Sequence, residues 1–305
     1  MTSDQTLSRR GFLGAAAGAA AATTLGPWAS SAVGEGGMPL PKHKIGFQLY
    51  AIRTMLAQDT VGTLNLLGAI GYEEIEPAFT YGTLTPAQFR DAADAAGLRV
   101  FASHLNPPDF RGDNLQRTLD NAEILGQDWI GVSSFASPSP ANQTVDAYKR
   151  FADEMNQFGA ATAARGIRWY AHLHDYEWRT DPQTGKVLFE VWLEETDPSL
   201  VWFELDLFWA VLAQADITGY LYGNEDRFPL FHVKDKARGS NEDADLGEGE
   251  IDFKTMFEGL KFPQNHHYVA ERDSQPDPPR TARVYYEWLT TVRLSRSNAA
   301  AAGAR

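Results

Sequence analysis

The chain has 305 residues, 43% of them hydrophobic and 22% charged, which is enough apolar material for the core of one large domain. Its formal net charge of −13 repels phosphate backbones and anionic lipids, so nucleic acid and acidic membrane surfaces are excluded as expected partners. No cysteine is present, which excludes disulfides and thiolate metal sites, so any metal must bind nitrogen and oxygen ligands.

The first thirty or so residues have the pattern of an export signal. Ser8–Gly14 (SRRGFLG) is a twin-arginine pattern, a weakly hydrophobic, alanine-rich run follows it, and small residues at 30–32 offer a cleavage site. We expect residues 1–32 to be a signal peptide read by the twin-arginine export machinery, leaving an exported protein, periplasmic or extracellular, without a membrane anchor. The alternative is a disordered tail with a chance arginine pair.

After a Gly/Pro-rich linker at 33–43, short apolar runs alternate with amphipathic segments. The fifth apolar run starts at Ile167 and ends in His172, Leu173 and His174. This run predicts the fifth of eight strands. Seven further apolar runs predict the other strands, at 45–50, 72–78, 98–105, 128–135, 200–207, 228–235 and 266–273. The amphipathic segments predict helices at 60–70, 85–96, 115–125, 145–165, 188–195, 209–213, around 220, at 253–260 and at 280–294.

Eight strands alternating with helices predict an α/β fold, a (β/α)8 TIM barrel that forms a single domain over residues 44–296. An open doubly wound sheet is the competing architecture. Such a sheet usually carries a glycine-rich phosphate loop after its first strand, and the stretch IGFQLYAIR contains none. The tail at 297–305 is expected to be disordered.

Polar side chains cluster at the carboxyl ends of the predicted strands, where barrel enzymes keep their active residues. Four of the seven histidines belong to this set. The set consists of Gln48, Glu76, His104, His172, His174, Asp206, His232, Lys234 and Glu271.

Four of these strand ends, on strands five to eight, predict one metal site. Its expected ligands are His174, Asp206, His232 and Glu271. His174 is preferred to His172, and Asp206 to the other strand-six carboxylate, because each lies nearer the mouth of its strand. Imidazole and carboxylate ligands suit a divalent cation such as Mn, Co, Mg, Fe, Ni or Zn. The alternative is a set of hydrogen-bonded barrel residues that holds no metal.

The other polar strand ends are candidates for catalysis and substrate binding. The expected catalytic residues are Glu271, His104, His172, Lys234 and Glu76. Each has a structural alternative, such as an ion pair for Lys234 or a solvated loop carboxylate for Glu76. Glu177 is a candidate to orient a ligand histidine. Gln48, Trp209 and Trp178 are expected to bind substrate, although aromatic residues near a barrel rim often belong to the core.

A divalent cation with acids and bases in reach favours proton transfer next to a carbonyl, through an enediolate that the metal stabilises. Returning the proton to another carbon gives isomerisation, and returning it to the opposite face gives epimerisation. Loss of a β-oxygen instead gives dehydration or elimination of a glycoside. The sequence leaves these outcomes open.

These residues resemble the xylose isomerase-like TIM-barrel superfamily, the sugar phosphate isomerase/epimerase group that includes inosose dehydratases and ketose 3-epimerases. The resemblance runs from about Ile45 to Leu289. It rests on the ordered motifs IGFQLYAIR, YEEIEPA, ASHL, YAHLHDYEW, FELDLFWA, RFPLFHVKD, LGEGEIDF and YVAERD.

The resemblance implies a metal held by His174, Asp206, His232 and Glu271. In the ketose epimerases the fifth-strand ligand is a glutamate that also serves as an acid/base, whereas that position here is His174. A second proton carrier must therefore come from His104, His172, Glu76 or Lys234. The superfamily also contains endonuclease IV enzymes with a richer metal cluster, which this acidic chain does not resemble.

We therefore expect a metal-dependent sugar isomerase or epimerase. One alternative is a keto-sugar dehydratase or keto-glycoside lyase on the same metal site, and another is a sugar-binding barrel without turnover. The expected ligand is a small sugar or keto-sugar. Whether copies of the chain associate as a homo-oligomer stays open.

Overall fold

The computed structural model describes residues 37–135 and 138–295. The predicted export signal at 1–32, the start of the linker and the predicted tail at 297–305 lie outside the described residues. Within the described part of the chain, no helix combines the length and the apolar character needed to cross a bilayer.

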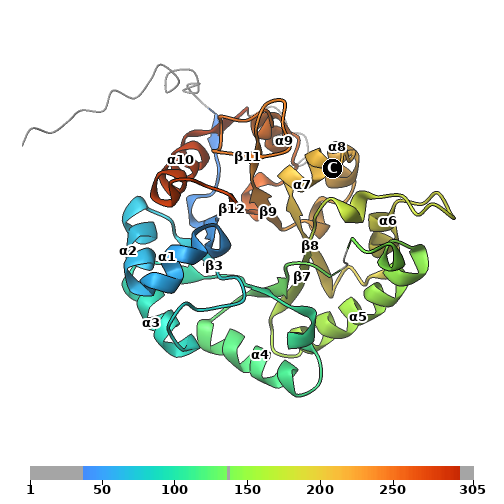
Figure 1. Ribbon diagram of the computed structural model, residues 1–305, viewed down its shortest axis with the longest axis horizontal. Helices are drawn as coiled ribbons and strands as arrows, with labels where there is room; N and C mark the ends of the chain where they lie inside the picture. Colours follow the sequence, from blue (N-terminus) through green and yellow to red (C-terminus); the bar gives the residue numbers. More distant parts are fainter. Residues whose placement is uncertain (1–36, 136–137, 296–305) are drawn as a thin grey trace, which may run out of the picture. The chain divides into compact units, whose positions relative to one another are not determined.

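A closed ring of parallel strands forms the centre of the fold, with helices around it (Figure 1). The sheet order is β4-β3-β2-β12-β9-β8-β7-β6-β5, and every pair in it is parallel. The strands are β2 (Ile45–Gln48), β3 (Glu74–Glu76), β4 (Arg99–Val100), β5 (His104–Leu105), β6 (Trp129–Val132), β7 (Arg168–His172), β8 (Val201–Asp206), β9 (Leu230–Val233) and β12 (His267–Ala270).

The two edge strands of this order, β4 and β5, are consecutive parts of the third predicted strand, so the ring closes through them. Ala78 pairs with His104 on one side, and the Gly131 N–H donates to the Ser103 carbonyl (3.0 Å) on the other. Between β4 and β5 the Phe101 carbonyl accepts two consecutive N–H groups, from Asp128 and Trp129, which is the pattern of a bulge. The eight predicted strand positions and the TIM barrel are therefore confirmed.

The predicted helices occur in the predicted order, and an additional short helix that was not predicted precedes them at Arg53–Gln58. The helices are α1 (Arg53–Gln58), α2 (Thr60–Ile70), α3 (Pro86–Ala95), α4 (Asp113–Leu125), α5 (Val145–Ala163), α6 (Leu188–Glu195), α7 (Leu207–Leu212), α8 (Ile217–Gly223), α9 (Phe253–Glu258) and α10 (Pro278–Thr291). Short 3-10 helices lie at Lys42–Lys44, Leu49–Ile52, Pro107–Phe110, Pro140–Asn142, Tyr176–Trp178, Glu225–Arg227 and Pro263–Asn265. Thr85 caps α3 in a capping box with Gln88, and Gly71, at φ 115°, ends α2.

The observed elements differ from the predicted ones mainly at their ends. The first strand stops at Gln48, because its side chain caps a 3-10 helix by accepting the Tyr50 N–H. The predicted last helix stops at Thr291, since Arg293–Leu294 forms β13 and pairs with β1 (Met38–Pro39). Two further short strands, β10 (Asp235–Lys236) and β11 (Asp243–Ala244), form an antiparallel hairpin after β9.

The fifth strand also ends earlier than predicted, and this matters for the site. β7 stops at His172, and the next turn begins a 3-10 helix at Tyr176–Trp178. The carboxylate of Glu177 accepts the backbone N–H of His174 (2.8 Å), which directs that group away from any strand partner. The alternation that would place His172 and His174 on one face of a strand therefore does not extend to His174.

Two apolar layers hold the barrel together. The large cluster packs the outward faces of the strands against the helices. A small, separate cluster contains Phe101, Trp129, Tyr170, Leu230 and Val269, one from each of five strand positions. Alternate side chains of a barrel strand point inward, so this cluster fills the interior below the polar strand ends.

Candidate active site

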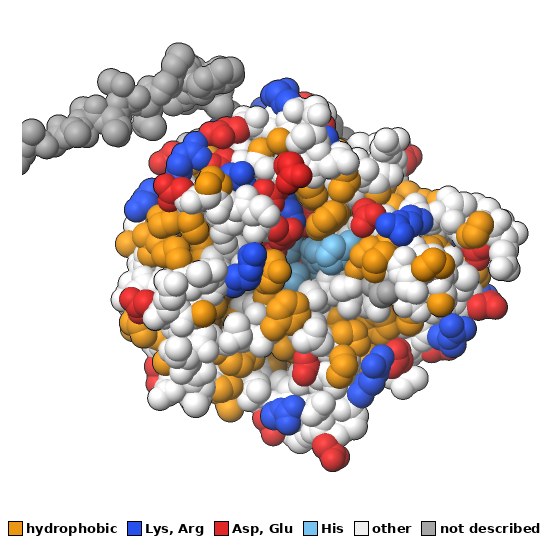
Figure 2. Space-filling view, in the orientation of Figure 1, with side chains coloured by type: hydrophobic (Ala, Val, Ile, Leu, Met, Phe, Trp, Pro, Cys, Tyr) orange, Lys and Arg blue, Asp and Glu red, His pale blue; other side chains and the backbone are white. Residues whose placement is uncertain are grey.

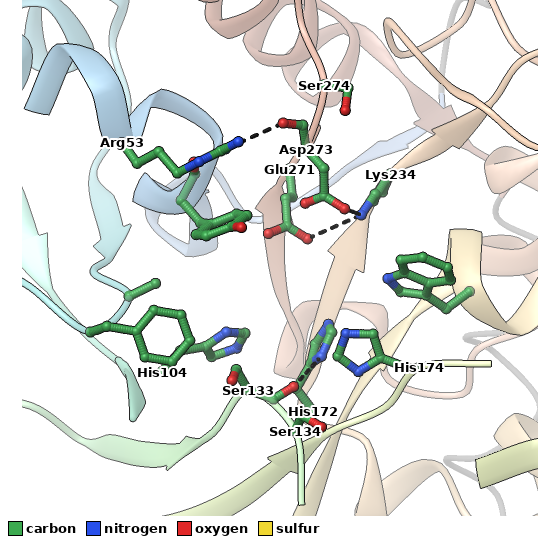
Figure 3. Close-up of a pocket in the computed structure, with 14 residues that line it drawn as sticks. Arg53, His104, Ser133, Ser134, His172, His174, Lys234, Glu271, Asp273 and Ser274 are labelled. Atoms are coloured by element: carbon green, nitrogen blue, oxygen red, sulfur yellow. Dashed lines mark hydrogen bonds and ion pairs between the residues drawn. The ribbon is translucent and has the colours of Figure 1, made fainter. Parts of the chain in front are cut away.

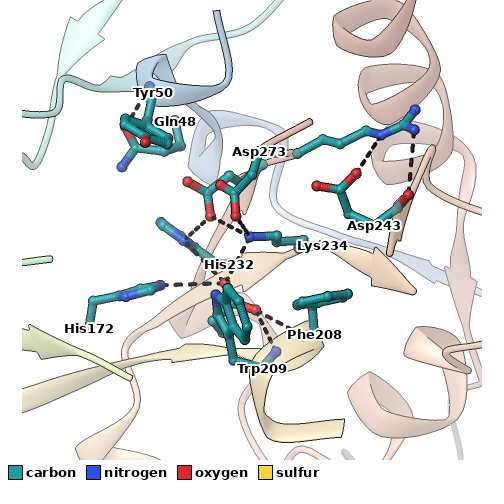
Figure 4. A network of polar contacts seen from close by, with 12 residues as sticks. Gln48, Tyr50, His172, Phe208, Trp209, His232, Lys234, Asp243 and Asp273 are labelled. Atoms are coloured by element: carbon teal, nitrogen blue, oxygen red, sulfur yellow. Dashed lines mark hydrogen bonds and ion pairs between the residues drawn. The ribbon is translucent and has the colours of Figure 1, made fainter. Parts of the chain in front are cut away.

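Four buried side chains from neighbouring strands meet at the carboxyl end of the barrel. His172 ends β7, Asp206 ends β8, His232 lies in β9 and Glu271 follows β12, and each offers a ligand atom within 4.8 Å of the others. Figure 4 shows His172 and His232 in this network. His172 Nε2 lies 3.5 Å and His232 Nδ1 3.8 Å from Asp206 Oδ2, and His232 Nδ1 lies 2.8 Å from Glu271 Oε2. Ligand atoms of one small divalent cation are separated by roughly 3–3.5 Å, so this group, here called the metal group, could hold such an ion.

The remaining polar atom of three members is fixed by another partner. His172 Nδ1 donates to the Ser133 carbonyl (3.0 Å), and Asp206 Oδ1 accepts the N–H groups of Phe208 and Trp209 (2.9 and 3.1 Å). His232 Nε2 lies 3.0 Å from Glu76 Oε2, to which it can donate. Of the atoms left over, His172 Nε2 and Asp206 Oδ2 are buried without a hydrogen bond, and the neighbours of His232 Nδ1 are the carboxylate oxygens of Glu271 and Asp206. Such buried polar atoms are costly unless they bind a ligand, and outer partners of this kind orient metal ligands.

The metal group contains His172 at the place where the sequence favoured His174. The Nδ1 atom of His174 lies 3.2 Å from the Tyr176 hydroxyl, and the two rings stack with centroids 5.2 Å apart. Burial lowers the pKa of His174 to about 3, so its imidazole is neutral. Glu177 orients the backbone of His174 rather than the ring of a ligand histidine.

A second polar layer lies beneath the metal group, between it and the apolar interior. Glu204 Oε2 lies 2.6 Å from His104 Nε2, and Glu204 Oε1 lies 3.2 Å from His232 Nε2. The Tyr170 hydroxyl donates to Glu76, the other carboxylate that faces His232. Glu76, predicted as a catalytic residue or substrate ligand, is fully buried in this layer. The layer therefore surrounds Nε2 of His232 with carboxylates and leaves Nδ1 facing the metal group.

Burial and neighbouring charges act on these groups in opposite directions. Burial raises the pKa of Glu76, and the negative charge of Glu204 adds to that effect. Burial would also raise the pKa of Glu204, but the charges of His232 and His104 outweigh it and lower that pKa. In the metal group, burial lowers the pKa of His172 well below its usual value, so this imidazole is neutral and keeps the lone pair that a metal ligand needs.

Lys234 and Asp273 form an ion pair beside the metal group (Figures 3 and 4). Lys234 Nζ also lies 3.8 Å from Glu271 Oε2 and 5.0 Å from the centre of the Trp209 ring. The chain after β12 is held in place by Arg272, whose guanidinium donates to Asp243 and Asp245. This anchor keeps Asp273 next to Lys234.

A cavity of about 380 Å³, here called the main cavity, opens above the metal group. Histidine side chains lie at the base of the hollow at the centre of this face (Figure 2). Its lining residues come from many different strand ends (Figure 3). They are Tyr50, Arg53, Ala78, Phe79, His104, Ser133, Ser134, His172, His174, Trp209, Lys234, Glu271, Asp273 and Ser274.

The structure brings most of the predicted site residues to this cavity, but not all of them. Trp178 packs on Phe189 and Tyr220, with ring centroids 4.7 and 5.4 Å away, and does not line the main cavity. Gln48 is fully buried and caps a turn, so it does not line the cavity either.

Sequence reasoning missed several residues at the site. Arg53 and Asp273 line the main cavity, and Ser133 fixes His172 through its backbone. Only Glu204 left a usable signal: it lies two residues before Asp206 in a strand, so both must point to the same side of the sheet.

Fold and site together define the class of protein: a TIM barrel whose carboxyl end holds a group of His, Asp and Glu side chains able to bind a cation. The family model described as "xylose isomerase-like TIM barrel" matches residues 64–292, and the chain belongs to this family. No curated protein matches the sequence.

Solved structures share the fold. A sugar phosphate isomerase/epimerase from Parabacteroides distasonis is 25% identical, with a TM-score of 0.70 over 86% of this chain and 98% of that one. An L-ribulose 3-epimerase is 17% identical, with a TM-score of 0.63 over 83% of this chain and 93% of that one. A probable 3-DHS dehydratase from Bacillus anthracis is 13% identical, with a TM-score of 0.64 over 81% and 98% of the two chains.

Proposed function

We propose that this chain is a divalent-metal-dependent isomerase or epimerase that moves a proton next to the carbonyl group of a sugar. The observation that carries the proposal is the convergence of four buried side chains, His172, Asp206, His232 and Glu271, whose ligand atoms lie within 4.8 Å of one another beneath the main cavity. The family and the epimerase among its structural neighbours support a sugar as the substrate.

His172, Asp206, His232 and Glu271 would hold the cation, which when bound polarises two neighbouring oxygens of the substrate. Glu271 lies at the cavity wall, where its carboxylate can accept the carbon-bound proton. Lys234, fixed by Asp273, can donate a hydrogen bond from Nζ to a substrate oxygen. His104 lies on another side of the cavity (Figure 3) and can return a proton from there.

The alternative reaction, elimination to a dehydrated sugar or a released glycoside, needs the same proton abstraction followed by loss of a β-oxygen. The Lys234–Asp273 ion pair supports this alternative. It holds the ammonium group of Lys234 beside the metal group, where that group could protonate a leaving oxygen. A barrel that binds sugar without turnover is the remaining alternative.

Deuterium wash-in distinguishes the three candidate functions: isomerase or epimerase, lyase, and sugar-binding barrel without turnover. Metal-loaded protein is incubated in D2O with a panel of ketoses and followed by NMR. Deuterium next to the carbonyl with an isomeric product supports the proposal, whereas an eliminated product supports the lyase. Binding without exchange supports the sugar-binding barrel.

The Lys234→Met variant tests the roles within the site. We expect normal metal content and a roughly 100-fold lower turnover, because only the substrate hydrogen bond is removed. Lys44→Met is the control, since Lys44 donates to the Asn265 carbonyl near the amino end of β12 and should leave both quantities unchanged. Unchanged kinetics in Lys234→Met would leave Lys234 as a structural ion pair.

Export by the twin-arginine route belongs to the same proposal, and the Ser8–Gly14 motif supports it. Replacing Arg9 and Arg10 by lysine should retain the protein in the cytoplasm, as measured by cell fractionation. Continued export of that variant would contradict the proposal.

A further inference from the structure

A second cavity of about 140 Å³, here called the side cavity, adjoins the main cavity. The two share Phe79 and His104 as lining residues. The side cavity has polar walls that include Asp109, Arg117 and Asn121. It therefore extends the space above the metal group beyond what the proposed chemistry uses.

Phe79, at the junction, is held in a strained backbone conformation. Its φ is 61°, a left-handed value that a bulky side chain rarely adopts. The Thr80 N–H bonds to the Ala78 carbonyl (2.8 Å) across Phe79, and the Phe79 N–H bonds to the His104 carbonyl (3.0 Å). This is the geometry of a strained three-residue turn, and such strain in ordered structure tends to occur at ligand sites.

The Phe79 ring is also unusually exposed, at 47%, and so is that of Tyr50, at 37%. The rings stand edge to face, 6.4 Å apart at 88°. The guanidinium of Arg53 lies 4.2 Å over the Tyr50 ring and donates to the backbone carbonyls of Tyr50 and Asp273, which fixes this wall of the main cavity. An aromatic face attracts the weakly positive C–H groups of a sugar ring, so the pair forms a surface suited to carbohydrate.

Asn121 offers a polar side chain in the wall of the side cavity. It is half-buried in α4, lines the side cavity, and its amide has no hydrogen bond to any residue that the structure describes. A side-chain amide can both donate and accept, which matches the hydroxyl groups of a sugar.

We propose that the two cavities form one binding site for a disaccharide or another glycoside. The reacting sugar lies over the metal group, the neighbouring unit stacks on Phe79, and its hydroxyl groups reach Asn121 in the side cavity. This inference rests on the proposed function for the position of the reacting sugar.

The test is calorimetric binding to the metal-loaded protein, with fructose as the single ketose and with lactulose, isomaltulose and turanose as its glycosylated forms. We expect at least one disaccharide to bind about tenfold more tightly than fructose. Phe79→Gly should lower the ratio of disaccharide to fructose affinity about tenfold, and Asn121→Ala should lower it roughly threefold. Phe262→Ala, which removes another exposed ring (54%), is the matched control and should change neither affinity.

The melting temperature separates a binding role from a structural one. Glycine adopts a φ of 61° without strain, so Phe79→Gly should melt at a higher temperature than the wild type while binding the disaccharide more weakly. A lower melting temperature with an unchanged affinity ratio would overturn the proposal. Failure of all three disaccharides to bind more tightly than fructose would overturn it as well.

The proposed function can fail separately. Absence of deuterium exchange with every ketose refutes proton transfer, but the affinity ratio still reports on the second subsite. Exchange with fructose together with an affinity ratio near one refutes the subsite alone.

Discussion

The two ends of the barrel use the same residue types in different ways. At the amino end, His267 Nδ1 lies 2.6 Å from Glu74 and is stacked on Phe101, and both nitrogens of His266 have oxygen partners at 2.8 and 3.1 Å. At the carboxyl end, His172 Nε2 is buried without a hydrogen bond, and the oxygens nearest His232 Nδ1 are those of Glu271 and Asp206, which belong to the metal group themselves. The contrast shows that the partners of a buried histidine, rather than its burial, distinguish a structural residue from a candidate ligand.

The carboxylates show the same difference. Glu74 is bound by both His267 and Arg99, so a cation and an imidazole balance its charge. Glu271 and Asp206 face each other around His172 and His232, with Lys234 as the nearby cation. Burial alone would lower the pKa of His232, but the negative charges of Glu204 and Glu271 outweigh it and raise that pKa, so this imidazole is a second cation at this end.

The largest expected effect comes from exchanging one histidine at each end. His232→Gln should lose the bound metal and at least about 1000-fold of turnover, because it removes a ligand from the centre of the metal group. His266→Gln should keep the metal and lower the free energy of unfolding by about 1–3 kcal/mol, because Glu225 loses a buried partner. Metal analysis, kinetics and denaturant unfolding measure the three quantities. Equal metal content in both variants would remove the distinction between the ends.

The second prediction concerns the two histidines of the fifth strand. His172→Gln should weaken metal binding by at least about 100-fold, whereas His174→Gln should leave the metal content near that of the wild type. The reason is that only His172 directs a free nitrogen into the metal group. Competition with a chelator measures the affinity, and the reverse result would restore the ligand assignment that the sequence favoured.

The third prediction compares buried glutamates. Glu204→Gln should weaken metal binding about 10- to 100-fold, because the layer beneath fixes Nε2 of His232 and thereby its tautomer. Glu74→Gln, its counterpart at the amino end, should reduce stability and leave the metal affinity unchanged. If the two variants bind metal equally well, the lower layer has no influence on the ligands.

The last prediction lies outside the site and concerns how the stability of the fold depends on pH at Glu177. Burial raises the pKa of this carboxyl group to about 8, and Oε1 is buried without a hydrogen bond. Between its ordinary pKa and pH 8 the unfolded chain releases this proton and the folded chain keeps it, so folding loses stability as the pH rises. Glu177→Gln removes that loss. The free energy of unfolding of the variant, relative to that of the wild type, should therefore rise by about 2–4 kcal/mol from pH 5 to pH 9.

Urea unfolding at both pH values measures the gain. Glu287→Gln, on the exposed face of α10, is the control and should shift stability equally at both. A gain for Glu177→Gln that is the same at pH 5 and pH 9 would contradict a buried, protonated carboxyl group.

The sequence by itself determined the order of strands and helices and hence the barrel. Apolar runs and helical periodicity are local patterns, and a capping box such as Thr85–Gln88 is read within a few residues. It also identified Asp206, His232 and Glu271 as members of one site, because the carboxyl ends of barrel strands meet at one face.

The tertiary structure decided which histidine joins them. The fifth strand ends at His172 because Glu177 and the following turn bind the backbone at His174, and a strand boundary of two residues is beyond what periodicity resolves. It likewise moved Glu76 beneath the site and Trp178 into the core, and brought Phe79 and Asn121 to one cavity. These placements depend on contacts between residues far apart in the chain, and such contacts leave no periodic signal in the sequence.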